Sequence, residues 1–66
     1  MAVMKVIEVM ASSDKSWEDA TSKAVKHASK SVKYIKSAFV QSQSAVINDD
    51  EIAEFRVNVK ITFEVK

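Results

Sequence analysis

The sequence predicts an α+β fold in which a three-stranded antiparallel sheet wraps on one helix, with the elements in the order β-α-β-β. Three observations predict this fold: a β-branched run at residues 3–10, an apolar stripe of helical spacing after Trp17, and a strict apolar–polar alternation over residues 54–66. The chain has 66 residues, which leaves room for one small domain, so we expect a single domain over residues 1–66.

The composition excludes several classes of function. The chain is 47% hydrophobic with a formal net charge of +1, which argues against nucleic acid as a main partner. It contains no Cys and no Gly, which excludes disulfides, thiolate nucleophiles and glycine-rich phosphate loops. Neither a nucleophile–base pair nor a metal triad is present, so we do not expect an enzyme.

The apolar runs are much shorter than the ~20 residues that a membrane-spanning helix needs. Residues 1–10 carry Lys5 and Glu8 within their apolar stretch and lack the plan of a signal peptide. We therefore expect a cytoplasmic protein with no membrane partner.

Residues 3–10 predict the first strand, because β-branched side chains dominate them. Apolar residues occupy both parities of this run, so we expect both faces of the strand to be at least partly buried. A helix is predicted at roughly residues 14–32. Its apolar positions recur three or four residues apart and form one stripe: Trp17, Ala20, Ala24, Ala28 and Val32, with Val25 beside them. Ser13 or Ser16 can cap its start, and Ser16 with Asp19 resembles a capping box.

The second strand is expected at residues 34–47. It is interrupted by a polar segment, residues 41–44, which a bend, a bulge or a face turned to water or ligand would explain. Residues 48–50 predict a hairpin turn. The third strand follows at residues 52–66, and its period of two predicts one buried and one polar face.

The lengths of these elements predict self-association. The third strand would extend about 50 Å at ~3.3 Å per residue. A helix of 19 residues would cover only about 28 Å at ~1.5 Å per residue. One helix cannot cover such a sheet, and small chains without disulfides or metals often depend on oligomerisation. We expect the contact surface at the overhanging end of the hairpin, formed by Phe55 and Val57 together with part of the second strand.

The chain resembles the dodecins, which are small proteins that assemble as hollow dodecamers and bind flavins. Four segments carry most of the resemblance: KVIEV at residues 5–9, SWEDA at 16–20, ASKSV at 28–32 and FRVNVKITFEV at 55–65. The resemblance implies a homododecamer that stores a small molecule. The ligand it implies is flavin, either riboflavin or FMN, sequestered at subunit interfaces.

In flavin-binding dodecins, a Trp on the second strand stacks on the isoalloxazine ring and a Gln on the third strand binds its polar edge. Without gaps, the Trp position falls on Ser37, flanked by Lys36 and Ala38, and the Gln position falls on Arg56. We take these four residues as the expected cofactor-binding positions. Ser37 has no aromatic face, and Arg56 can donate hydrogen bonds or bind a phosphate but cannot accept. The alternative is therefore a structural or interaction oligomer without flavin, which holds at most ions or coenzyme A-like ligands.

Other candidate residues favour structural roles. His27 is the only His, so we expect it to be solvated or at an interface rather than a metal ligand. Trp17 is expected to be a core aromatic rather than a ligand-stacking ring. Ser13 and Ser16 are expected to be caps rather than nucleophiles, because no base is placed to activate them.

Two charged segments remain. Residues 48–51 offer four oxygen-bearing side chains, but they lack the EF-hand spacing, and we expect a turn. Charges of both signs line the third strand: Glu54, Arg56, Lys60, Glu64 and Lys66. We expect them in cross-strand or inter-subunit ion pairs. A polar cavity wall that binds phosphate or carboxylate through Arg56 and Lys60 is the alternative.

Overall fold

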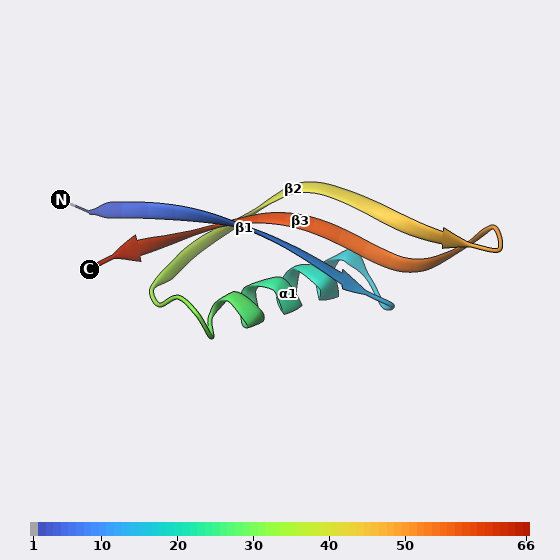
Figure 1. The fold of residues 1–66 in the computed structure, drawn as a ribbon, viewed down its shortest axis with the longest axis horizontal. Helices are drawn as coiled ribbons and strands as arrows, with labels where there is room; N and C mark the ends of the chain where they lie inside the picture. The colour runs from blue at the N-terminus through green and yellow to red at the C-terminus, as the bar shows by residue number, and fades with distance from the viewer. Residues whose placement is uncertain (1) are drawn as a thin grey trace.

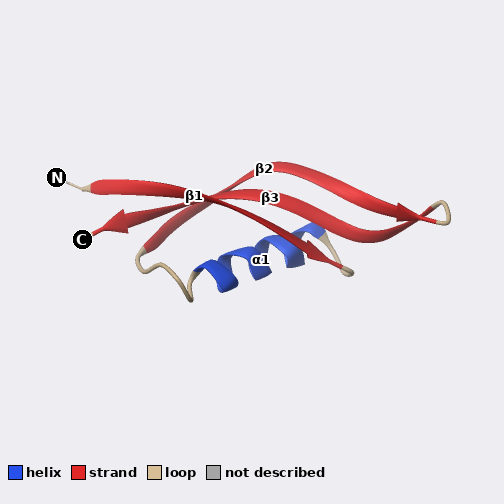
Figure 2. Ribbon diagram, in the orientation of Figure 1, coloured by secondary structure: helices blue, strands red, loops and turns tan. Residues whose placement is uncertain are grey.

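The computed structural model describes residues 2–66 and confirms the predicted order of elements (Figure 1). The elements are β1 (Val3–Ser13), α1 (Trp17–Ala28), β2 (Ile35–Asn48) and β3 (Glu51–Val65). The three strands form one antiparallel sheet in the order β1-β3-β2, so the last strand is the central one. The helix lies against one face of this sheet (Figure 2).

The core is a thin layer between α1 and the centre of β3. Its buried members are Ala20, Ala24, Ala28, Val57, Val59 and Ile61. The alternation in β3 is thus confirmed, since its odd-numbered residues supply the buried face. The alanine stripe lets the helix approach the sheet closely, but small side chains bury little area.

Ser16 caps α1, as one of the two expected alternatives. The Ser16 hydroxyl accepts a hydrogen bond from the Asp19 N–H at 2.9 Å. The second half of a capping box is absent here, because the Asp19 carboxylate accepts a 2.6 Å hydrogen bond from the hydroxyl of Ser13 instead. Ser13 is buried, and its oxygen also accepts from the Lys15 N–H at 2.9 Å. The Ser13–Asp19 bond therefore ties the end of β1 to the first turn of α1.

The helix ends at Ala28, earlier than the expected residue 32. The Ser29 hydroxyl donates to the Lys26 carbonyl at 2.6 Å, and the Lys30 N–H bonds the His27 carbonyl at 3.1 Å. Serine side chains compete in this way for helix carbonyls, and the shorter backbone bond tightens the final turn. The short-range hydrogen bonds end the helix before Val32.

The hairpin turn is confirmed, and it needs an unusual backbone. Asn48 pairs with Glu51, and the two residues between them, Asp49 and Asp50, have φ of 52° and 63°. Two consecutive positive φ values fit the tight type I′ turn of a two-residue hairpin, and Asp tolerates this region better than most residues.

The polar segment in β2 is explained by a bulge. The pairing of β2 with β3 shifts between Val40 and Ser42, which leaves Gln41 as the extra residue. A bulge inserts one residue, so the side chains that face the core change from even-numbered to odd-numbered positions of β2. Further shifts lie between Ile35 and Ser37 and between Val46 and Ile47.

Trp17 joins the helix to the hairpin, which confirms its expected structural role. Its ring meets Phe55 edge-on, with centroids 4.8 Å apart and an interplanar angle of 76°. Its indole N–H donates to the Ser44 carbonyl at 2.9 Å. One side chain therefore holds both strands of the hairpin against the start of α1.

The sheet extends far beyond the helix. The molecule is 51 Å long, whereas twelve helical residues span about 18 Å at ~1.5 Å each. The β2–β3 hairpin runs past the start of α1 (Figure 1). The expected placement of Phe55 and Val57 in this overhang is wrong: Val57 is only 1% exposed beneath α1, and Phe55 packs on Trp17.

The exposed apolar side chains of the overhang are instead Ile47 on β2 and Ile52 on β3, which are 60% and 52% exposed. They face each other across the hairpin, next to the turn. Because residues 2–66 leave them largely uncovered, they are the better candidates for a contact with a second copy.

We predict that Ile52→Asp weakens self-association, because it places an unpaired charge in a contact that excludes water. Size-exclusion chromatography with light scattering at low micromolar concentration should show a smaller species. Ile52→Val, which keeps the apolar surface, should elute like the wild type. An Ile52→Asp variant that retains the full assembled mass would contradict this placement of the contact.

We also predict a stability loss in acid that depends on Asp19. Its hydrogen bond from Ser13, and then its contact with Lys23 at 3.2 Å, hold the pKa of the Asp19 carboxyl below its ordinary value of 3.8. A lowered folded-state pKa stabilises the fold above about pH 4, and this contribution is lost as the pH falls through that pKa.

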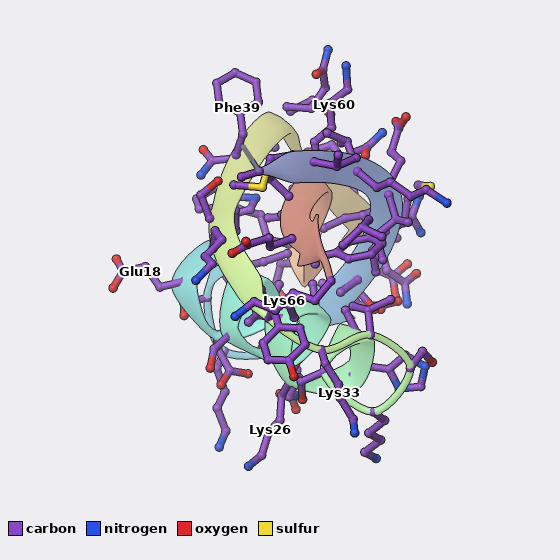
Figure 3. The ribbon with its side chains drawn as sticks, turned by 90° about the vertical axis from the view of Figure 1, so that its left-hand side faces the viewer. Glu18, Lys26, Lys33, Phe39, Lys60 and Lys66 are labelled. Atoms are coloured by element: carbon purple, nitrogen blue, oxygen red, sulfur yellow. The ribbon has the colours of Figure 1, made fainter. Side chains whose placement is uncertain are left out.

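Thermal unfolding of Asp19→Asn should therefore show a lower midpoint than the wild type at pH 7 and a smaller difference near pH 3. Glu18→Gln is the matched control, since Glu18 is exposed in the same turn and points away from the sheet (Figure 3). An Asp19→Asn deficit that is equal at both pH values would refute the prediction.

Candidate functional site

The sheet face opposite the helix is left uncovered by residues 2–66. We call it the open face. It is defined by the even-numbered residues of β3 and by their cross-strand partners on β1 and β2; the β3 members are Arg56, Asn58, Lys60, Thr62 and Glu64. Met4, Val6 and Met10 of β1 lie on this face and are exposed. The expectation that both faces of β1 are partly buried is therefore wrong for a single chain, because α1 covers one face only.

Two of the four expected cofactor-binding residues lie on the open face. Ser37 pairs with Thr62, and Arg56 pairs with Ser44. Thr62 and Arg56 are six residues apart on β3, which corresponds to about 20 Å at ~3.3 Å per residue. One chain does not bring Ser37 and Arg56 together, so a single site that uses both would draw them from two chains.

The other two expected residues are placed differently. Lys36 is the extra residue of the bulge between Ile35 and Ser37, and its ammonium lies 3.5 Å from a carboxylate oxygen of Glu64. Ala38 pairs with Ile61, a core residue, so it belongs to the helix-side face rather than to the face of Ser37.

Phe39 is a prominent residue of the open face that is not among the four expected cofactor-binding positions. It pairs with Lys60 on β3 and is 65% exposed. Phe39 and Lys60 project from the side of the sheet opposite the helix (Figure 3). The signal was available in the sequence, because Phe39 lies two residues after Ser37 and strand residues two apart share a face.

Some polar side chains in the middle of the open face already have hydrogen-bond partners within the chain. The Asn58 side-chain N–H donates to a carboxylate oxygen of Glu8 at 2.8 Å. The Asn58 amide oxygen is buried and accepts no hydrogen bond from residues 2–66. Between the described residues, ion pairs link Lys36 with Glu64 and Lys23 with Asp19. The expected cross-strand pairing is therefore present in part, and Lys60 takes no part in it.

The exposed side of α1 is basic. Lys23, Lys26, His27 and Lys30 line a shallow groove there. His27 is exposed, as expected. Within residues 2–66, the His, Asp and Glu side chains do not gather into a group of three that could hold a metal ion. The helix in this part of the chain is too short and too polar to cross a membrane.

Comparison with known proteins gives one consistent family. A sequence model described as Dodecin matches residues 3–66. A protein of Mycobacterium tuberculosis named calcium dodecin is 32% identical over 66 residues, which is 100% of this chain and 93% of that protein.

Solved structures agree with this family. The dodecin of Streptomyces coelicolor has a TM-score of 0.94 at 25% identity and covers 98% of this chain and 93% of its own. The calcium dodecin structure from Mycobacterium tuberculosis, described as having a novel calcium-binding site, has a TM-score of 0.85 at 31% identity, with coverages of 97% and 91%. An arginine-to-alanine mutant of a Thermus thermophilus dodecin has a TM-score of 0.94 at 21% identity, with coverages of 100% and 97%, which shows the fold alone. The predicted β-α-β-β fold is thereby confirmed.

Proposed function

The chain belongs to the dodecin family, and on that premise we propose that it is a small-molecule binding and storage protein. Its ligand is flavin, either riboflavin or FMN, held at subunit interfaces of a hollow homododecamer. The observation that carries the proposal is the open face, a broad apolar and polar surface that the fold leaves uncovered.

Assembly supports this function physically. Dodecamer assembly is known for this fold. The overhanging hairpin and the open face of this chain both expose apolar side chains that a second copy can cover. Symmetry repeats each contact, so a site between two copies recurs throughout the shell.

The mechanism is sequestration. A flat aromatic ligand held between chains is removed from water, which lowers its free concentration and limits its photochemistry. The contribution of the chain is binding, through apolar contact, hydroxyl groups and cationic side chains. No covalent step is required of any residue.

The direct test is a titration of purified protein with riboflavin and with FMN, followed by quenching of flavin fluorescence. We expect quenching at micromolar concentration and absorbance of a bound flavin in the assembled peak. A colourless protein that leaves the fluorescence of both flavins unchanged would exclude flavin storage.

An oligomer that holds ions instead of an organic ligand is the second candidate. One observation favours it: the relative of 32% identity is named calcium dodecin. Isothermal titration of chelator-treated protein with calcium distinguishes the two. Heat from calcium binding together with no response to flavin would favour this candidate.

We predict that Ser37→Trp tightens flavin binding, because it restores an aromatic face at the position where the family has Trp. Stacked aromatic pairs contribute ~0.5–1.5 kcal/mol beyond area, so the gain should be about 2- to 10-fold in Kd. Ser22→Trp is the matched control, since Ser22 is exposed on α1 and away from the sheet. Equal affinities for Ser37→Trp, Ser22→Trp and wild type would contradict a flavin site beside Ser37.

A further inference from the structure

A compact group on the open face combines an aromatic ring, a cation and two hydroxyls. We call it the Phe39 patch. It consists of two adjacent cross-strand rows, Phe39–Lys60–Glu8 and Ser37–Thr62–Val6. Strands lie ~4.8 Å apart and residues two apart lie ~6.6 Å apart, so the patch measures about 10 by 7 Å.

We propose that the Phe39 patch is the ligand subsite of this chain, and that Phe39 supplies the stacking ring in place of the Trp that Ser37 replaces. This inference rests on the proposed flavin function and deepens it. The ligand it fits is a planar fused-ring aromatic molecule that carries an anionic group, which among flavins is FMN rather than riboflavin.

The exposure of Phe39 supports a stacking role. Its ring is 65% exposed on a sheet whose opposite face holds the core, so intramolecular packing does not account for a large aromatic there. In the next row along the strand stand Ser37 and Thr62, which lie on the same face of the sheet as the ring. A flat ligand can therefore lie against Phe39 and over these two residues.

The polar groups select the ligand. Lys60 lies next to Phe39 across the strands, and its ammonium is not committed to either ion pair of the described chain. A lysine ammonium binds phosphate as a point charge with three donors. The hydroxyls of Ser37 and Thr62 can both donate and accept, so they suit the mixed polar edge of a heteroaromatic ring.

Glu8 lies on the far side of Lys60 from Phe39. Its carboxylate is engaged by the Asn58 side-chain N–H at 2.8 Å. The positive potential beside Phe39 therefore comes from Lys60, while Glu8 limits how far an anionic group can extend toward β1.

Titrations of three variants with FMN and riboflavin test the inference. Phe39→Leu keeps an apolar side chain of similar size without the ring face and should weaken both flavins about 2- to 10-fold. Phe39→Tyr keeps the ring and should bind both flavins like the wild type. Lys60→Gln should weaken FMN about 2- to 5-fold and leave riboflavin unchanged, because riboflavin has no phosphate.

The outcomes separate the inference from the proposed function. Wild-type protein that binds neither flavin overturns both. Wild-type binding that Phe39→Leu leaves unchanged, or a Lys60→Gln loss that is equal for FMN and riboflavin, overturns the inference alone. Light scattering of Phe39→Leu provides a further check: loss of the assembled mass means that a second copy covers Phe39, which also overturns the ligand assignment.

Discussion

The mismatch between a short helix and a long sheet governs this structure. Twelve helical residues cover part of one face of a molecule 51 Å long. Their buried stripe is three alanines, so the core of one chain is thin. A domain this small buries a limited fraction of its surface, which leaves apolar side chains exposed that other copies could cover. The overhanging hairpin and the open face follow from the same mismatch.

Two side chains strengthen the contact between the short helix and the sheet at one end of α1. Trp17 contacts Phe55 and the Ser44 carbonyl, which fixes the hairpin to the start of the helix. Asp19 accepts from Ser13 and so fixes the end of β1 to the same turn. Both contacts gather at one end of α1, so the chain is held together near the helix start while its hairpin remains uncovered.

Period and composition predicted the elements well, because the alternation in β3 and the alanine stripe are local patterns. The positions of the elements relative to one another were harder to predict. Val57 was assigned to the overhang because sequence spacing does not show where along a sheet a helix lies. The bulge at Gln41 and the early end of α1 depend on pairing and on side-chain hydrogen bonds. At the candidate site, Ser37 and Arg56 come from alignment with a family. The sequence places Phe39 on the same strand face as Ser37, but only strand pairing shows that it lies beside Lys60.

The central claim is that the folded chain depends on its copies. Analytical ultracentrifugation over a dilution series, with circular dichroism on the same samples, tests it most directly. The account predicts that folded protein sediments as an oligomer and that dilution sufficient to dissociate it also removes its secondary structure. A compact 7.4 kDa species that keeps its full secondary structure would contradict the account.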